Sequence, residues 1–495
     1  MIAYSKRRLH LAVMAASVAT PMTSDAVRLG TDGHGQALIY PLYTARSTTS
    51  GNAYVTAVSV INPTASAKAV KVRFLEGKAG AEVLDFNLFL SQYDVWTAGI
   101  IAAGPGAGIF TLDNSCTTPR VSNSSASPTM FRNGTYVGDG YADTLDRTYE
   151  GYLEILEMGA IVSGSTLEAR VTHKQDLSAP NASKPLCSDV PLTADVPAGL
   201  VKPSGGLMGN ASFININDGT DVAIDAIALT QWSDSVQWSP PGSVHPNLTD
   251  ATPAVSTVVD SRPAGDAMIV SRWQNGRDAV SAVLMTDLIR NDFTVEPAIK
   301  AATDWIVTMP TKRFYMNRLV GTAPFATQGA PDAGQRVGMA YFDREEQTPG
   351  QLICDLKIFC PPNQRSELAY ATTTIPWVIN SGRSSSGLVL GGRSVSGGLV
   401  GLNTNFINGW GEMRLSAEAT AALVAPAGMS IVTDTLTGVT TPNVNVTYYG
   451  LPVVGFAAQS YSTTGLPGVN ANVLSNYGGS FVHKVTRRIV VGSKG

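Results

Sequence analysis

The sequence predicts an all-β fold with two or more immunoglobulin-like or jelly-roll-like β-sandwich domains and long loops. Three observations lead to this prediction. Apolar Val70, Val72 and Phe74 alternate with Lys71 and Arg73, and a period of two is typical of half-buried strands. Turn-forming residues separate such segments, since the 495 residues include 48 Gly and 28 Pro. Amphipathic helical patterns are scarce, which favours layered sheets over alternating strands and helices.

Short segments of this kind recur along the chain. The expected strands are 37–43, 54–61, 70–74, 84–90, 95–101, 109–112, 152–158, 167–172, 212–216, 223–230, 268–273, 280–288, 305–309, 339–342, 431–436, 444–449 and 481–491. Two segments are expected to be helical. Pro297 suits the first turn of a helix over 297–304, and Pro426 would end a helix over 416–424.

Composition limits the kinds of partner. Charged residues make up 15% of the chain, apolar residues 44%, and the formal net charge is −3. The charged fraction is well below the roughly 25% usual for soluble domains, so Ser, Thr, Asn and Gly must cover much of the surface. This balance excludes a basic nucleic-acid binder, an acidic disordered tail and a charge-rich helical protein.

The first 26 residues resemble a secretory signal peptide. Lys6, Arg7 and Arg8 precede a short apolar run that ends in small residues, and this order is typical of an export signal. Cleavage is expected after Ala26, with Ala19 as the alternative. The apolar run is too short for the roughly 20 residues of a membrane-spanning helix. We therefore expect an exported protein without a transmembrane helix.

Three regions are expected after the signal peptide. Residues 27–200 fit one β-sandwich, closed by a proline-rich stretch from Pro191 to Pro203. Residues 201–362 fit a second. The remainder, 363–495, is rich in Gly, Ser and Val and forms either a third β region or part of the second domain. Within it, GRSSSG at 382–387 and GRSVSG at 392–397 read as two strand-turn units or as an arginine loop for an anionic ligand.

The chain has four cysteines, Cys116, Cys187, Cys354 and Cys360. In an exported protein these are most simply two disulfides. Proximity in the sequence favours pairing Cys116 with Cys187 and Cys354 with Cys360, and the second pair requires a turn near residues 355–357. A zinc site is disfavoured, because no Cys-x2-Cys spacing is present and no histidine lies near a cysteine.

Candidate chemistry is sparse. Asp139, Asp143 and Asp146 lie in a polar loop and are weak Ca²⁺ candidates, although EF-hand spacing is missing. The simpler expectation is a solvated loop leading into a strand whose carboxylates face water. Glu150 and Glu154 could form a hydrolytic pair, but on one strand they lie about 13 Å apart, beyond the roughly 5–10 Å that glycosidases use. No catalytic residue and no cofactor other than possible calcium is predicted.

Several long strings resemble a known group of proteins. They are GQALIYPLYT at 35–44, KAVKVRFLEG at 68–77, VLDFNLFL at 83–90, DWIVTMPTKRFY at 304–315 and FVHK at 481–484. These strings resemble uncharacterised secreted or cell-surface proteins of Gram-negative proteobacteria. The resemblance implies an exported bacterial β-protein and supplies no catalytic residues.

The expected function is that of a non-enzymatic structural subunit in an extracellular filament, sheath or surface layer. Its partners would be further copies of itself or other cell-surface components, joined by strand edges or donated strands. The strand expected to be exchanged is the apolar segment formed by Gln36, Leu38, Ile39, Tyr40, Leu42 and Tyr43. The alternative is a secreted carbohydrate-binding or carbohydrate-active protein.

Overall fold

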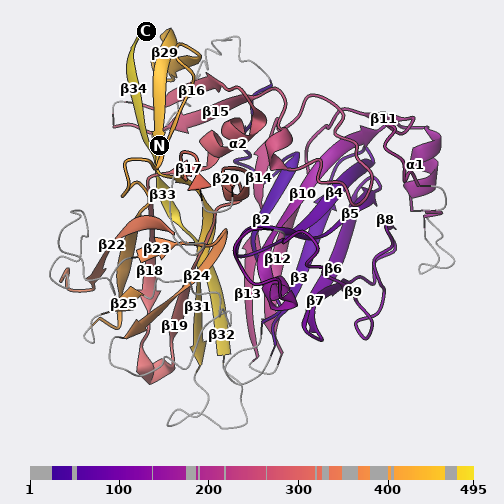
Figure 1. Cartoon of the computed structure of the whole chain (residues 1–495), viewed down its shortest axis with the longest axis horizontal. Helices are drawn as coiled ribbons and strands as arrows, with labels where there is room; N and C mark the ends of the chain where they lie inside the picture. The colour runs from indigo at the N-terminus through magenta and orange to yellow at the C-terminus, as the bar shows by residue number, and fades with distance from the viewer. Residues whose placement is uncertain are drawn as a thin grey trace, which may run out of the picture.

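Antiparallel sheets dominate the molecule, as the sequence predicts (Figure 1). In this computed structural model, the structure describes residues 25–46, 53–136, 138–173, 185–187, 190–216, 219–263, 265–317, 320–325, 334–347, 366–379, 400–402, 406–462 and 476–494. The signal peptide up to residue 24, Cys354, Cys360 and the repeats at 382–397 lie outside these residues, and predictions about them stay predictions.

The N-terminal half contains two sheets that enclose one apolar core. The first sheet runs in the order β1 (Arg28–Leu29), β14 (Ile227–Thr230), β2 (Ala37–Thr44), β10 (Glu150–Ile161), β4 (Lys68–Glu76), β5 (Glu82–Leu90) and β8 (Cys116–Thr118), with β11 (Leu200–Val201) also paired to β10. The second runs β13 (Thr220–Asp225), β12 (Met208–Asn215), β3 (Val55–Asn62), β6 (Asp94–Ala103), β7 (Gly106–Phe110) and β9 (Thr129–Met130). Strands β12 to β14 follow residue 200, so this half extends to Thr230.

The C-terminal half holds three larger sheets. The third sheet contains β15 (Val255–Asp260), β16 (Ala267–Arg272), β28 (Ser430–Asp434), β29 (Thr440–Tyr449), β27 (Ala422–Val424) and β34 (Arg488–Lys494). The fourth contains β23 (Ser366–Leu368), β22 (Gln335–Asp343), β26 (Asn408–Arg414), β18 (Leu288–Thr294) and β33 (Lys484–Thr486). The fifth contains β25 (Val400–Leu402), β24 (Thr372–Ile379), β19 (Ala302–Thr308), β31 (Val454–Ser462) and β32 (Asn476–Val482). Residues 366–494 therefore share sheets with the preceding region.

Small elements complete the described fold. Two two-stranded sheets pair β17 (Met285–Thr286) with β30 (Leu451–Pro452) and β20 (Met316–Asn317) with β21 (Val320–Gly321). The helices are α1 (Thr166–Val171) and α2 (Gly276–Leu284), and the 3-10 turns are η1 (Leu145–Tyr149), η3 (Leu248–Asp250), η4 (Pro297–Ile299) and η5 (Lys312–Phe314). None of the helices in the described residues is long and apolar enough to cross a membrane.

Strand β2 is buried on both faces. Its eight residues are all buried; Leu38 and Tyr40 enter the core between the first two sheets, whereas Ile39 faces a second core shared with α2 and the third sheet. The second sheet also borders the C-terminal half directly, because β13 lies beside β32, where the Ser480 hydroxyl donates to the Ala223 carbonyl (Figure 1). A continuous apolar run such as 37–43 is typical of a strand covered on both sides.

Four predicted elements differ in type from those in the structure. Residues 167–172, expected as a strand, form α1, because the Ser165 side chain caps it by accepting a hydrogen bond from the Glu168 amide. Residues 280–288, also expected as a strand, begin in α2, which Asn275 caps in the same way. Seven of the nine residues of this helix are buried, and a short apolar run of this kind does not distinguish a buried strand from a buried helix.

The two predicted helices are wrong for local reasons. Pro297 opens only the single turn η4, since Lys300 adopts a left-handed conformation with φ 45° and strand β19 follows at Ala302. Residues 416–424 form turns that lead into β27. Extended pairing of β19 and β27 with their neighbours therefore overrides the weak local helix signals.

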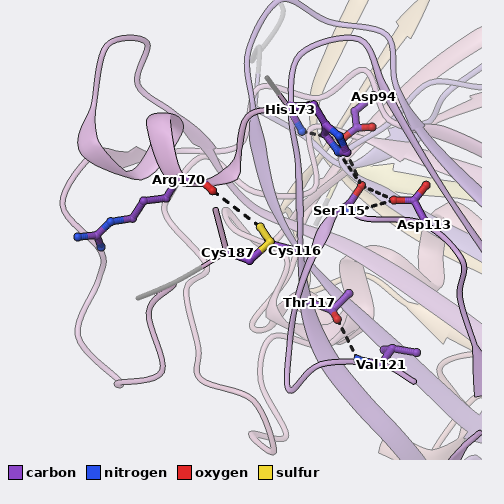
Figure 2. The surroundings of a disulfide bond; sticks show 10 residues. Asp94, Asp113, Ser115, Cys116, Thr117, Val121, Arg170, His173 and Cys187 are labelled. Atoms are coloured by element: carbon purple, nitrogen blue, oxygen red, sulfur yellow. Dashed lines mark hydrogen bonds and ion pairs between the residues drawn. A yellow bond between two sulfur atoms is a disulfide. The ribbon is translucent and has the colours of Figure 1, made fainter. Parts of the chain in front are cut away.

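The predicted disulfide between Cys116 and Cys187 is present (Figure 2). Its Cα atoms lie 5.3 Å apart, and it ties β8 to a segment 71 residues further along the chain. Cys116 also belongs to a small apolar cluster with Phe89 and Leu167. The bond therefore fastens α1 and the segment that follows it to the edge of the first sheet.

Removing this disulfide should lower stability substantially. We expect Cys116→Ser/Cys187→Ser to reduce the free energy of unfolding by about 2–4 kcal/mol, because a long loop regains its entropy in the unfolded chain. Urea unfolding of the variant and of the natural protein measures this difference in free energy. Equal free energies would show that the bond contributes nothing beyond the packing around it.

Candidate functional site

The predicted calcium loop is occupied by arginine contacts. The Asp139 carboxylate lies 2.5 Å from a guanidinium nitrogen of Arg147, and the Asp146 carboxylate lies 3.5 Å from Arg46. Asp143 accepts a hydrogen bond through its backbone carbonyl from Asn133. In the part of the chain that the structure describes, no three or more His, Cys, Asp or Glu residues are placed to hold a metal ion.

The carboxylates of β10 do not face water, so that prediction is wrong. All three glutamates are at most 2% exposed, and each binds a different cation: Glu150 with Arg46 at 3.0 Å, Glu154 with Arg73 at 3.2 Å, and Glu157 with Lys68 at 2.9 Å. Different segments cover them: Glu150 is reached by Thr374 of β24, whereas Glu157 accepts hydrogen bonds from the Ser204 and Gly205 amides. Separate arginines neutralise Glu150 and Glu154, which argues against a shared hydrolytic role.

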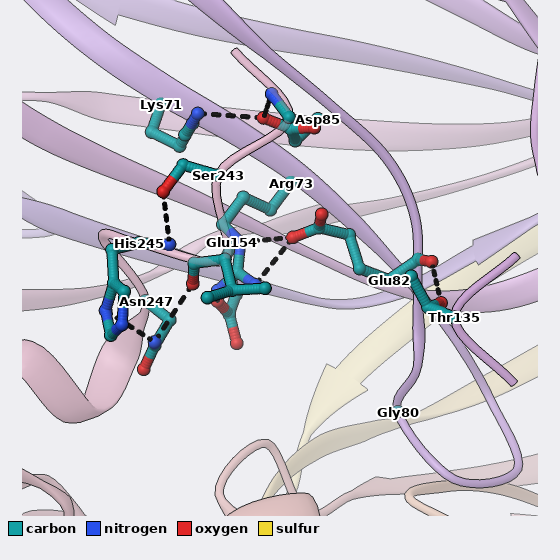
Figure 3. A network of polar contacts seen from close by, with 12 residues as sticks. Lys71, Arg73, Gly80, Glu82, Asp85, Thr135, Glu154, Ser243, His245 and Asn247 are labelled. Atoms are coloured by element: carbon teal, nitrogen blue, oxygen red, sulfur yellow. Dashed lines mark hydrogen bonds and ion pairs between the residues drawn. The ribbon is translucent and has the colours of Figure 1, made fainter. Parts of the chain in front are cut away.

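A layer of charged side chains extends from β10 across β4 and β5 (Figure 3). Arg73 lies between Glu154 and Glu82, whose carboxylate is 2.6 Å from its guanidinium. Lys71 binds Asp85 at 2.8 Å and donates to the Pro240 carbonyl of a covering loop. Buried charges of this kind must be paired, because an isolated ion in an apolar interior is very costly.

Glu154 is the least satisfied member of this layer. Its Oε2 atom contacts Arg73, whereas Oε1 is buried without a hydrogen-bond partner. Burial raises the pKa of Glu154 from 4.5 to about 7, against the opposing effect of Arg73. Folding therefore favours the protonated carboxyl, and this group lowers stability as the pH rises from about 4.5 to 7.

Glu154→Gln should remove this pH dependence. The amide cannot ionise, so the stability of the variant relative to the natural protein should rise by up to about 3 kcal/mol between pH 4.5 and 7.5. Urea unfolding at both pH values measures the difference. A difference that stays constant with pH would show that folding does not raise the pKa of Glu154.

A serine, a histidine and an aspartate also meet beside the disulfide (Figure 2). The Ser115 hydroxyl lies 3.4 Å from His173 Nε2, and the Asp94 carboxylate lies 3.6 Å from the same nitrogen. A catalytic triad needs the serine and the carboxylate on opposite ring nitrogens. Ser115 instead donates to Asp113 at 2.7 Å, so this cluster supports the loop and lacks the geometry of a triad.

A second histidine–carboxylate pair lines an open pocket. His245 Nδ1 lies 2.8 Å from Asp250, and Trp238 and Thr252 also line this pocket. The same Asp250 carboxylate accepts a hydrogen bond from the Asn247 amide and closes the capping box of η3. Its orientation is thus explained by the turn, and nothing in the pocket marks a particular ligand.

The C-terminal segment, residues 476–494, is called the tail. It passes along the edges of three sheets, where β32 pairs with β31, β33 with β18 and β34 with β29. Each pairing uses one side of the tail strand. Figure 1 shows β32 and β33 crossing the C-terminal half and β34 rising beside β29 at the chain end.

Apolar side chains of the tail remain in contact with solvent. Five of them are 46–63% exposed: Tyr477, Phe481, Val482, Val485 and Val490. Two tail residues point inward instead. His483 is 5% exposed, and the Arg487 guanidinium donates to the backbone carbonyls of Val283 and Met285 at 2.7 and 3.3 Å. Besides strand pairing, the side chains of His483 and Arg487 hold the tail against the protein.

An apolar cavity of about 160 Å³ lies beneath the tail. The inner wall comes from Leu29, Ile227 and Val307, in three different strands, and the tail closes it with Val485 and Arg487. Interiors are normally packed closely, and unfilled apolar space forfeits dispersion contacts. The tail thus covers this cavity without filling it.

His483 fixes the point where β32 passes into β33. Its Nε2 lies 3.1 Å from the Ile306 carbonyl, and its Nδ1 lies 3.3 Å from the Asn291 side-chain amide. These contacts fit a neutral ring that donates at Nε2 and accepts at Nδ1. Burial lowers the pKa of His483 from 6.5 to about 4.

The sequence-predicted assembly strand lies elsewhere. Gln36, Leu38, Ile39, Tyr40, Leu42 and Tyr43 are buried in or next to β2, between β14 and β10 of the same chain. The tail was expected as one strand over 481–491, and breaks at His483 and Arg487 divide it. The valines of the tail were the available signal for an edge strand, because alternation of apolar and polar residues alone does not distinguish an edge strand from a central one.

Comparisons with protein-family models, with curated proteins and with solved structures find no match to this chain. The likeness to secreted proteobacterial proteins therefore stays a prediction from the quoted strings.

His483→Gln should change the pH dependence in the direction opposite to Glu154→Gln. The unfolded chain binds a proton near pH 6.5 and the folded chain near pH 4, so His483 makes stability rise with pH between these values. The variant lacks this gain. Its stability relative to the natural protein should fall by up to about 3 kcal/mol from pH 4 to 7 in urea unfolding. A relative stability that rises or stays level would contradict a buried neutral ring.

Proposed function

We propose that this chain is an exported, non-enzymatic structural subunit that joins further copies of itself into an extracellular filament, sheath or surface layer. The observation that carries the proposal is the tail: in the described residues its last two strands, β33 and β34, each pair with a single neighbour, and five apolar side chains of the tail are exposed. An unpaired strand edge offers a row of backbone donors and acceptors to another chain. Proteins that stay monomeric usually protect such edges with charge or proline.

The outermost strand of the tail has little such protection. In the described residues β34 pairs with β29 alone, and Val490 faces outward at its centre. No proline occurs in β34, and its charged residues are Arg488 and Lys494 at the two ends. A neighbouring strand could add to this edge through backbone hydrogen bonds, and Val490 would supply apolar contact.

Other features support an exported, non-enzymatic role. The Cys116–Cys187 disulfide fits an oxidising compartment, as does the predicted signal peptide. The paired sheets fit the immunoglobulin-like or jelly-roll-like architecture expected for such subunits. The buried carboxylates are each explained by a structural ion pair, as for Glu150 and Glu157.

Charged substitutions on the tail should prevent assembly. Tyr477→Lys/Val490→Lys adds two charges to solvent-facing positions outside the lining of the cavity and should raise the concentration needed for polymer formation at least tenfold. Leu112→Lys is the matched control, because Leu112 is also exposed but lies outside the tail. Negative-stain microscopy and sedimentation of the purified proteins measure polymer.

The natural protein and the control should form ordered polymers. Urea unfolding of the monomers should show that each substitution changes stability by less than about 0.5 kcal/mol, as is usual at exposed positions. Monodisperse natural protein that binds glycans on an array would overturn the proposal in favour of a carbohydrate-binding role. Equal assembly of the tail variant and the control would exclude the outer edge of the tail as the interface.

A further inference from the structure

The distal tail, β33 and β34 at residues 484–494, sits in a groove built entirely by distant parts of the chain. The groove is formed by the edge of β18, by the cavity beside it, whose wall includes Ile289 of β18, and by the edge of β29 further along the tail. Thr486 accepts a hydrogen bond from the Asp287 amide at 2.9 Å, and Arg487 bonds to Val283, 204 residues away in sequence. The distal tail contributes only Val485 and Arg487 to the lining of the cavity, and the rest of the groove comes from other segments.

The contacts that hold the distal tail do not depend on which copy supplies it. Pairing with β18 and β29 uses backbone hydrogen bonds, and the Arg487 guanidinium donates to backbone carbonyls. The inward side chains Ile489 and Val491 pack at the margin of the core under the third sheet. A second copy carries the same residues, so its distal tail fits the same groove in the same register.

The segment that joins the distal tail to the rest of the chain allows the distal tail to move from its own groove to that of a second copy. His483 and Arg487 are the two positions at which strand pairing is interrupted, on either side of β33. Residues 476–482 remain paired to β31 as β32. A change of backbone direction at His483 would therefore release the distal tail while the fifth sheet keeps all its strands.

We propose that β33 and β34 are exchanged between copies, so that the distal tail of one subunit occupies the groove of its neighbour. This inference rests on the proposed function and specifies how the copies are joined. Each subunit then gives one distal tail and receives one, and every groove in the interior of the polymer is filled. Repetition of this head-to-tail contact generates an open chain of subunits.

A crosslink between two copies tests the exchange directly. Thr447 and Val490 lie opposite each other in β29 and β34, and neither is buried. Directly opposed strand residues lie close enough for a disulfide. We would mix Thr447→Cys protein with Val490→Cys protein before assembly, oxidise, and look for a covalent dimer. Exchange predicts that this heterodimer forms during assembly.

A matched pair on the opposite edge of the same sheet serves as the control. Val259 and Met268 lie opposite each other in β15 and β16, and neither is buried. A mixture of Val259→Cys and Met268→Cys proteins should give no heterodimer above the level of the natural protein, because β15 and β16 stay within one chain. Heterodimer at both sites would indicate random contact and would overturn the exchange.

A locked tail separates the exchange from the proposed function. Thr447→Cys/Val490→Cys, oxidised as a monomer, holds the distal tail on its own chain. Exchange predicts that the locked protein loses polymer formation and that reduction restores it, while oxidised Val259→Cys/Met268→Cys protein assembles normally. Assembly of the locked protein would overturn the exchange and leave edge-to-edge joining in place. Failure of the natural protein to assemble would overturn both.

Discussion

The burial of the first sheet on both faces is the constraint on which the rest of the structure depends. One face meets the second sheet, and the other meets the third sheet, α2 and the covering loops. Any charge on that outer face must find a partner within the protein. Arg73 does so between two glutamates from different strands, and Lys71 reaches a carbonyl of the covering loop. The charged layer thus joins the two halves by directional contacts, whereas apolar packing alone would tolerate sliding.

The centre and the periphery of the molecule differ in how firmly they are held. Strand β2 has neighbours on both edges and a core on each face. The distal tail strands β33 and β34 each pair on one edge in the described residues, carry exposed valines, and border an unfilled cavity. Local stability varies across proteins in this way, and segments with few buried contacts open most readily. A segment suited to changing partners is therefore expected at the tail, and β2 is suited to holding the chain together.

Period-two alternation predicted most strands, because one apolar face in a half-buried strand leaves a clear trace in the sequence. It failed for α2, whose buried surface extends nearly all round and whose position is marked mainly by the capping residue Asn275. It also failed for Glu150 and Glu154, since nothing local to a carboxylate reveals which distant arginine will bury it. The disulfide was predictable from the order of the cysteines, whereas the tail groove was not, because it combines the nearby strand β29 with β18, which lies far away in the sequence.

The bonding of Arg487 has a consequence for how this protein can diverge. Its guanidinium is satisfied by main-chain oxygens of Val283 and Met285, which every amino acid supplies. These bonds place no demand on the side chains of Val283 and Met285, which are constrained instead by their burial in the core. They depend on the arginine itself, because lysine lacks the planar fork that reaches several carbonyls at once. Aliphatic exchanges in the wall of the groove should therefore leave the hold on the tail intact, whereas a change at this one tail position should not.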